Sequence, residues 1–343
     1  MLRGIYHKIK NANADELRRW RFVFWLSFLS SSLLAATILL LIGLSSPDSR
    51  SANFVSVEIK KQATPMIATK PLYAVMIDNA REARPQSGLN QAAMVIEAPV
   101  EGGYTRLLAV FDSSASISAI GPVRSIRPYF IDWAKSLGAA VVHIGGSPAA
   151  MEQMQQFPYP NVDGIKSGCC MYRLKDRFSP HNAYTSSDLL KKYVANDIEL
   201  PEILYRYDGN EAKGDVALGV EIEFAKNIQK PSFRYNQILG GYIRSQGKEI
   251  QKDALDNKPV MTENIVIMKT EIEVIDSQSR RSVETTGAGE ALFLMNGKVV
   301  KGTWERTDNG PLVFKDNDGE NVVWNPGRIW IEVVDNDSVI NLF

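Results

Sequence analysis

The chain has 343 residues, of which 45% are hydrophobic and 23% are charged, so a disordered or collagen-like chain is excluded and two domains are expected. Lysine and arginine together number 39, as do aspartate and glutamate, and the formal net charge is therefore zero. A general nucleic-acid binder needs a basic excess, so we expect no nucleic-acid partner.

An apolar segment near the N-terminus predicts a membrane span. Residues 22–44 carry no charge, and as a helix they would be about 34 Å long, against about 30 Å of bilayer hydrocarbon. The run is too long for the core of a cleaved signal peptide, and no A-x-A-like site follows it. Residues 1–21 hold six basic and two acidic side chains. The positive-inside rule then predicts a single-pass protein of the cell membrane, with a cytoplasmic tail and its later domains outside.

A polar segment and a first domain follow the predicted span. Residues 45–70 lack periodicity, which indicates a linker. Residues 71–208 alternate between strand-like and helix-like segments, which predicts an α/β-type or mixed α+β sheet domain. The predicted strands are rich in β-branched residues and cover 71–78, 92–99, 105–112 and 139–146. The predicted helices begin with proline or a serine cap and cover 127–138, 147–157 and 186–197.

Residues 212–343 predict a smaller, β-rich second domain. Asn296-Gly297 between two apolar runs is a strong signal for a type I′ hairpin. Trp304, Trp324 and Trp330 could stack on sugars, but core packing is the commoner use of tryptophan in a small β domain. Strand character extends over 233–247, 263–276 and 291–306, and a further turn is predicted at 317–319.

Polar side chains in the first domain gather where the predicted strands end. Function tends to reside in loops held by a rigid scaffold, so this distribution predicts a ligand-binding cleft at the strand ends. The candidate binding residues are Asp78, Asn79, Arg84, Glu97, Glu101, Arg106, Arg124, Arg127, His143, His181 and Asn182.

Each group of candidates also has a structural interpretation. Glu97 and Glu101 could act as general acid and base, but a salt-bridge network with nearby arginines is the more common arrangement. Arg124 and Arg127 could hold a phosphate or carboxylate in a bidentate manner, or could be surface arginines. His143 lies in an apolar strand, where a hydrogen-bonded core histidine is the better interpretation.

The sequence offers little support for a metal or a cofactor. The histidines fit no zinc spacing, and a P-loop and a G-x-S-x-G elbow are both absent from the sequence. Cys169 and Cys170 are the only cysteines. They could form a vicinal disulfide, stay reduced or pair with another chain, and they cannot provide a disulfide framework. We therefore expect neither a metal site nor a cofactor.

The amino-acid sequences of several motifs closely resemble those of the YerB-like family of bacterial cell-surface proteins. The resemblance covers about residues 71–343 and includes VMIDNAREARPQSG, IGPVRSIRPYF, HIGGSP, SPHNAYTS, GYIRSQG and NPGRIWIEV. It implies an α/β-type domain followed by a β-rich domain, on the outer face of the cytoplasmic membrane. Relatives often carry a lipobox cysteine where this chain has an apolar segment. The family implies no reaction, so no catalytic residue is carried over.

Two classes of function follow from these patterns. The leading hypothesis is an extracytoplasmic binding module that holds a polar or anionic ligand through its arginines. A cell-wall peptide, a glycan or an envelope protein would be the partner. The alternative is a cell-wall-directed hydrolase that uses Glu97 or Glu101 with His181. A scaffold that regulates another envelope enzyme is a third possibility, and whether the protein is an enzyme stays open at this point.

Overall fold

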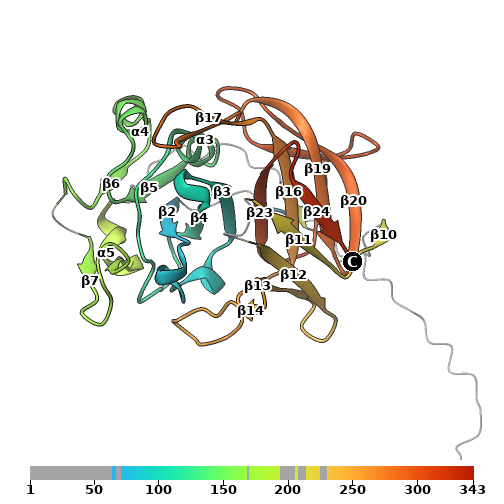
Figure 1. Ribbon diagram of the computed structural model, residues 1–343, viewed down its shortest axis with the longest axis horizontal. Coiled ribbons are helices and arrows are strands. Elements are labelled where there is room, and N and C mark those ends of the chain that lie inside the picture. Colours follow the sequence, from blue (N-terminus) through green and yellow to red (C-terminus); the bar gives the residue numbers. More distant parts are fainter. Residues whose placement is uncertain (1–63, 67–70, 168–169, 194–204, 208–213, 225–229) are drawn as a thin grey trace, which may run out of the picture. The chain divides into compact units, whose positions relative to one another are not determined.

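Strands dominate the computed structural model of the chain, which describes residues 64–66, 71–167, 170–193, 205–207, 214–224 and 230–343 (Figure 1). Within these residues, strands make up 47% and helices 13%. The α-helices are α3 (Pro128–Ser136), α4 (Pro148–Gln153) and α5 (Ser187–Leu190), and the single 3₁₀ turns are η1 (Arg81–Ala83), η2 (Leu89–Gln91), η3 (Glu101–Gly103), η4 (Met154–Gln156) and η5 (Lys191–Tyr193).

The largest sheet that the described residues form has 11 strands and draws on both halves of the chain, which we call the first half (71–208) and the second half (212–343). The first half contributes β2 (Leu72–Asp78), β3 (Met94–Pro99), β4 (Thr105–Asp112), β5 (Ala139–His143) and β6 (Asn161–Asp163). The second half contributes β10 (Asp215–Val216), β16 (Asn264–Thr270), β19 (Gly287–Met295), β20 (Lys298–Arg306), β21 (Val313–Asp316) and β23 (Ile329–Asp335). The spatial order is β10-β20-β19-β16-β23-β3-β4-β2-β5-β6, and β21 pairs with β20.

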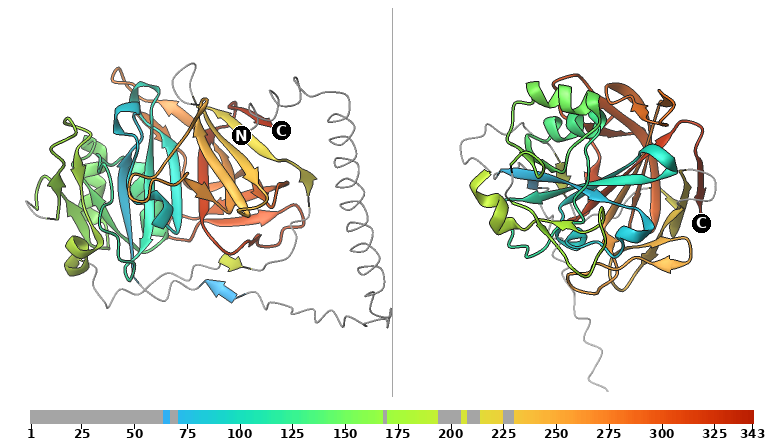
Figure 2. Two further views of the ribbon diagram at one scale, coloured as in Figure 1. Left: turned by 90° about the horizontal axis from the view of Figure 1, so that it is seen from below. Right: turned by 60° about the vertical axis from the view of Figure 1, so that its left-hand side comes forward.

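Parallel pairing between β3 and β23 joins the two halves into one sheet. Met94 lies opposite Ile329, and Glu97 lies opposite Glu332. On its other side β23 pairs with β16, also in parallel. Figure 2 shows the blue and teal strands of the first half continuing into the red and orange strands of the second half. Backbone hydrogen bonds therefore connect segments that lie more than 200 residues apart in the sequence.

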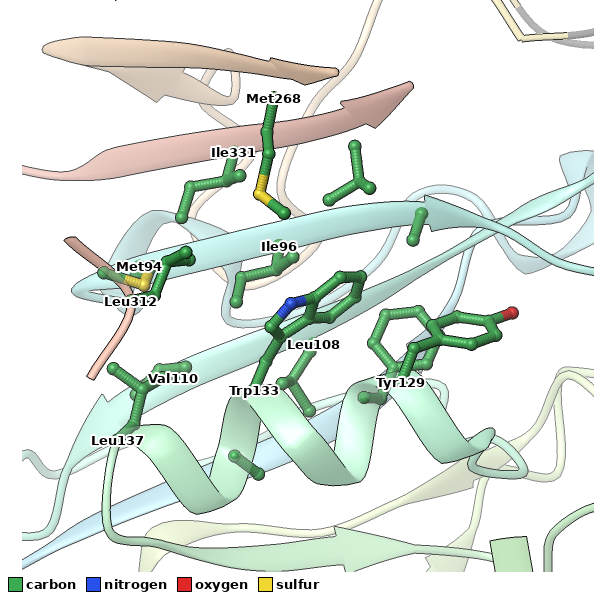
Figure 3. Close-up of a cluster of buried hydrophobic side chains, with 14 of the residues drawn as sticks. Met94, Ile96, Leu108, Val110, Tyr129, Trp133, Leu137, Met268, Leu312 and Ile331 are labelled. Carbon is green, nitrogen blue, oxygen red and sulfur yellow. The ribbon is translucent and has the colours of Figure 1, made fainter. Parts of the chain in front are cut away.

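The sheet is buried on both faces, which explains why its central strands read as continuous apolar runs. All seven residues of β2 are buried. Because side chains alternate along a strand, Met76 belongs to one core cluster, and Val75 and Ile77 belong to the other. Helix α3 covers the first face, where Trp133 packs over the sheet beside Leu108 (Figure 3).

A second sheet covers part of the other face, so that the second half is a packed pair of sheets. Phe233 and Tyr242 from this second sheet share a core cluster with Ile265 and Ile267 of β16. The order of its strands is β14-β13-β12-β11-β24, with β15 on β13. Their bounds are β11 (Gly219–Glu223), β12 (Pro231–Asn236), β13 (Gly241–Gln246), β14 (Glu249–Ile250), β15 (Met261–Thr262) and β24 (Val339–Leu342).

Three smaller sheets complete the described strands. One has the order β1-β9-β22, and the other two are the pairs β17-β18 and β7-β8. Their bounds are β1 (Thr64–Met66), β9 (Tyr205–Tyr207), β22 (Val323–Trp324), β17 (Ile272–Val274), β18 (Arg281–Val283), β7 (Tyr172–Arg173) and β8 (Ala183–Tyr184).

The predicted fold class, an α/β or mixed sheet domain beside a β-rich domain, is wrong, because the structure is mostly β. Predicted helices proved short: α4 ends at Gln153, and α5 ends at Leu190. Strand β4 lies between β2 and β3 and pairs with both in antiparallel orientation, so these three strands do not form units of strand, helix and parallel strand. The alternation of predicted strands and helices along the sequence therefore predicted the wrong fold class, because an α/β sheet requires helical crossovers over both faces.

Many local predictions are confirmed. The four strands predicted in the first half correspond to β2, β3, β4 and β5. Ser147 and Ser186 cap their helices by accepting from the amides of Ala150 and Leu189, at 3.3 Å in each case. Asn296-Gly297 forms the turn between β19 and β20, and both residues have positive φ as a type I′ turn requires. The tryptophans of the second half, Trp304, Trp324 and Trp330, are all buried in the core.

The predicted membrane span at 22–44 and the basic tail at 1–21 lie outside the described residues. Within the residues that are described, no helix has the length and apolarity needed to cross a bilayer. Part of the predicted linker is not a simple tether, because 64–66 forms β1 and pairs with β9. Cys170 is buried, and its neighbour Cys169 lies outside the described residues.

Candidate functional site

The end of β2 presents a carboxylate to two basic side chains. Asp78 is the last residue of β2 and is 4% exposed. Its Oδ2 lies 2.8 Å from His181 Nδ1 and 2.9 Å from Arg124 Nε. Its Oδ1 accepts a hydrogen bond from the amide of Ala80 at 3.0 Å. The carboxylate therefore orients the imidazole through a hydrogen bond and forms an ion pair with the guanidinium, although both residues are far from Asp78 in the sequence.

A second ion-pair group lies at the turn between β3 and β4. Arg127 donates from Nε and NH2 to the two carboxylate oxygens of Glu101, at 2.6 and 2.7 Å. Burial raises the pKa of Glu101, but the hydrogen bonds and charge of Arg127 outweigh that effect and hold the pKa below its usual value. Arg106 donates to the carbonyl of Ser125 at 2.7 Å, and its NH2 lies 4.0 Å from Glu101. Burial, followed by the nearby charge of Arg127, lowers the pKa of Arg106 to about 10.

These two groups share one cleft of about 490 Å³, which we call the strand-end cleft. Five of the predicted candidates line it: Asp78, Glu101, Arg106, Arg124 and His181. The sequence did not point to three further lining residues, Glu82, Tyr104 and Gln278. Tyr104 is 41% exposed and follows the Gly102-Gly103 turn. The sequence feature that could have identified it is an aromatic residue directly after a glycine pair. Gln278 comes from the turn between β17 and β18, and its position has no local signal in the sequence.

Asn79 and Glu97 lie beneath the cleft in a buried network rather than in its wall. Glu97 Oε1 accepts from Asn79 Nδ2 at 2.9 Å and from Thr105 Oγ1 at 2.6 Å. Its Oε2 accepts from NH2 of Arg244 at 2.6 Å. Glu97 and Arg244 are both fully buried. Direct contact between Glu97 and a ligand in the cleft is therefore precluded in this conformation.

Arg127 pairs with Glu101 but does not line the cleft, and the three remaining candidates lie elsewhere. Arg84 donates to the backbone carbonyl of Asn79 at 2.8 Å and lines a different cleft. His143 is buried and sits between the carbonyl of Gly145 and Oδ1 of Asn161, both at 2.8 Å, as expected for a hydrogen-bonded core histidine. Asn182 accepts from Arg173 at 2.6 Å within its own loop. The structure therefore brings five of the eleven candidates into one cleft.

The strand-end cleft is suited to polar recognition. Its wall combines three carboxylates with two guanidiniums and one imidazole, so it offers both donors and acceptors to a ligand. Because Nδ1 of His181 faces the Asp78 carboxylate, we assign a proton to Nδ1. Among the residues that the structure describes, no group of three or more histidine, cysteine or acidic side chains is arranged to hold a metal ion.

Comparison with known proteins identifies relatives over most of the chain. Residues 56–199 match the N-terminal domain, and residues 220–331 the C-terminal domain, of the family described as protein of unknown function DUF3048. YerB of Bacillus subtilis (strain 168), which is named as a lipoprotein, is 32% identical over 270 residues, covering 76% of this chain and 80% of YerB. The crystal structure of YerB from Bacillus subtilis matches with a TM-score of 0.72 at 30% identity, over 82% of this chain and all of that one.

Proposed function

The chain belongs to the DUF3048 family, and from that premise and the geometry of the strand-end cleft we propose that it is an envelope-associated binding protein. The similarity to a protein named as a lipoprotein supports an association with the membrane. We propose that residues 71–343 act on the outer side of that membrane. The ligand would be a polar molecule with at least one anionic group, and a peptide fragment of the cell wall fits this chemistry.

The arrangement of Arg124 carries this proposal. Its Nε forms an ion pair with Asp78 at 2.9 Å, and its side chain is 29% exposed and lines the cleft. A guanidinium that is already oriented loses little conformational freedom when it binds a carboxylate or phosphate. Arg106 adds a second cation to the same wall. Arg127 differs from these two, because Glu101 occupies its guanidinium in a bidentate pair.

The test is retention of cell-wall peptides by an Arg124→Ala variant. Muropeptides released from purified wall by a muramidase are mixed with the full-length chain, and the bound fraction is measured by equilibrium dialysis. We expect affinity to fall about tenfold or more, because a hydrogen bond to a charged group contributes about 1.5–3 kcal/mol. Thermal unfolding should change little, since Asp78 keeps its contact with His181.

Arg173→Ala is the matched control, because Arg173 is exposed and bonded to Asn182 outside the cleft. It should bind muropeptides like the unaltered protein. Unchanged binding by Arg124→Ala would contradict the proposed role of the cleft. A large loss of thermal stability in that variant would assign Arg124 a structural role instead.

The pair formed by Asp78 and His181 favours a hydrolase as the second candidate. An imidazole that a carboxylate orients, and that lines a cleft, has the arrangement of a general base. In this hypothesis His181, rather than Glu97 or Glu101, is the catalytic group. Glu97 is buried against Arg244, and Glu101 is paired with Arg127. Release of soluble fragments from purified wall by the unaltered protein, but not by His181→Ala, would favour hydrolysis over binding alone.

A further inference from the structure

A second cleft, of about 790 Å³, lies between the first and second halves of the chain. One wall comes from the segment 81–85, which contains η1, and the other from the hairpin formed by β13 and β14. Five basic side chains line this basic cleft, together with one carboxylate, that of Glu249. The five are Arg81, Arg84, Lys230, Lys248 and Lys252.

Most of this positive charge is not neutralised by neighbouring carboxylates. Lys230 forms an ion pair with Glu223. Arg81, Lys248 and Lys252 are exposed, and none of them forms an ion pair with a residue that the structure describes. Among the lining residues and their ion-pair partners, the basic side chains exceed the acidic ones by three, and carboxylates outside the lining also act on Arg84. The whole chain has no net charge, so this excess is a local concentration of positive charge.

Arg84 forms a fixed part of the wall. Its NH2 donates to the carbonyl of Asn79 at 2.8 Å, which holds the guanidinium in place. Burial, followed by the like charge of Arg244, lowers the pKa of Arg84 to about 10. Arg84 therefore presents a fixed guanidinium to the basic cleft.

The opposite wall is also tied to the first half of the chain. Gln251, at the end of the hairpin segment, is 5% exposed and donates to Oε1 of Gln86 at 2.8 Å. Gln251 also accepts from Arg244. The two walls are thus connected through buried hydrogen bonds, so the basic side chains are displayed on a preformed cleft rather than on separate loops.

We propose that the basic cleft binds a phosphate-bearing polyanion, at a site separate from the strand-end cleft. Arginine guanidiniums match the geometry of phosphate oxygens, and lysines add mobile point charges around them. Several cations in one cleft lie close enough to act together on a ligand with two or more negative groups. The concave shape favours a chain or a small oligoanion that can enter the cleft over a flat bilayer surface.

The test is calorimetric titration of the full-length chain with sodium tripolyphosphate at low ionic strength. The unaltered protein should bind saturably, and binding should weaken as salt is added. The variant Lys248→Ala/Lys252→Ala should bind about tenfold more weakly or worse, because it loses two exposed charges from one wall. Both lysines are exposed, so the variant should unfold at the same temperature as the unaltered protein.

Two matched variants isolate the site. Lys175→Ala/Lys301→Ala removes the same charge from exposed positions outside the cleft and should bind tripolyphosphate normally. Arg124→Ala should also bind it normally, so failure of the strand-end cleft and failure of the basic cleft are distinguishable. The absence of saturable binding, or equal binding by Lys248→Ala/Lys252→Ala, would overturn the proposal.

Two further probes test the chemical class of the ligand. Poly-L-glutamate should bind more weakly than tripolyphosphate at equal charge, and equal affinity would refute the preference for phosphate. Vesicles containing phosphatidylglycerol carry the same phosphate chemistry on a surface. Co-sedimentation with these vesicles, without binding of tripolyphosphate, would identify a membrane-facing surface and would also overturn the proposal.

Discussion

Two buried carboxyl groups and one guanidinium lie near one another where β3 meets β23. Glu97 and Glu332 lie opposite each other in the parallel pairing, and both are fully buried. Arg244 donates to Glu97, and its guanidinium lies 4.8 Å from the ring centroid of Trp330, a cation–π contact. Burial, followed by the negative charge of Glu97, raises the pKa of Glu332 well above its usual value. We therefore expect Glu332 to hold a proton in the folded protein.

This assignment predicts how stability depends on pH. A folded-state pKa that is raised makes the folded state bind the proton more tightly, so stability is fully present below about pH 4 and declines as pH rises toward the folded pKa. Glu332→Gln removes that titration while keeping the shape of the side chain. The unfolding free energy of the variant, relative to the unaltered protein, should therefore increase as pH rises, by up to about 1.4 kcal/mol per pH unit.

Urea denaturation at several pH values between 5 and 8 measures this difference. Glu273→Gln is the control, because Glu273 is exposed on β17. That variant should differ from the unaltered protein by a nearly constant amount. A constant difference for Glu332→Gln as well would show that the proton is not held at Glu332.

At the scale of elements, one ion pair fixes the start of α3 against the turn between β3 and β4. Arg127 immediately precedes α3 and pairs with Glu101 of η3 through two hydrogen bonds. The side chains are only 12% and 22% exposed. Such a pair resists solvent screening better than a surface pair, and its bidentate geometry adds directionality.

Arg127→Ala should therefore destabilise the protein, whereas Arg124→Ala should not. We expect a loss of about 1–3 kcal/mol at neutral pH, because Glu101 is left half-buried without its partner. Since the folded pKa of Glu101 is lowered, this contribution is present above its unfolded pKa, near pH 4, and is lost as pH falls below it. Denaturation of the single variants and of Arg127→Ala/Glu101→Ala gives the coupling energy. A coupling energy near zero would contradict the structural role of the pair.

At the scale of the whole molecule, the shared sheet predicts that the two halves unfold together. Besides the pairing of β3 with β23, Asp253 from the second half accepts from the amides of Gly88 and Asn90 at 3.0 and 2.8 Å. Asp253 is fully buried. The division of the sequence into a first domain at 71–208 and a second domain at 212–343 stays a prediction. Cooperative unfolding is a separate property, which these contacts favour.

Asp253→Ala should destabilise both halves equally. We expect a loss of about 2–4 kcal/mol, because two backbone amides in the junction lose their acceptor. Hydrogen exchange followed by mass spectrometry should show faster exchange in β2 and β4 as well as in β16 and β19. Asp337→Ala, at an exposed turn before β24, serves as the control. Faster exchange confined to the second half would show that the halves unfold separately.

The sequence by itself determined the local features of this protein. Strand β2 was predictable because a strand buried on both faces needs an unbroken apolar run, and the helix caps at Ser147 and Ser186 were predictable because capping involves residues only three apart. The five candidate residues of the strand-end cleft were also identifiable as polar groups at the ends of predicted elements or in the loops between them.

Only the tertiary structure decided the fold class and the partners of the buried charges. Glu97 and Arg244 are 147 residues apart, and β3 and β23 are still further apart in the chain. Nothing in the sequence near either residue records such a partner, because pairing across a sheet depends on how distant strands are ordered in space. For the same reason, the sequence suggested Glu97 as a cleft residue, whereas the fold buries it against Arg244 beneath the cleft.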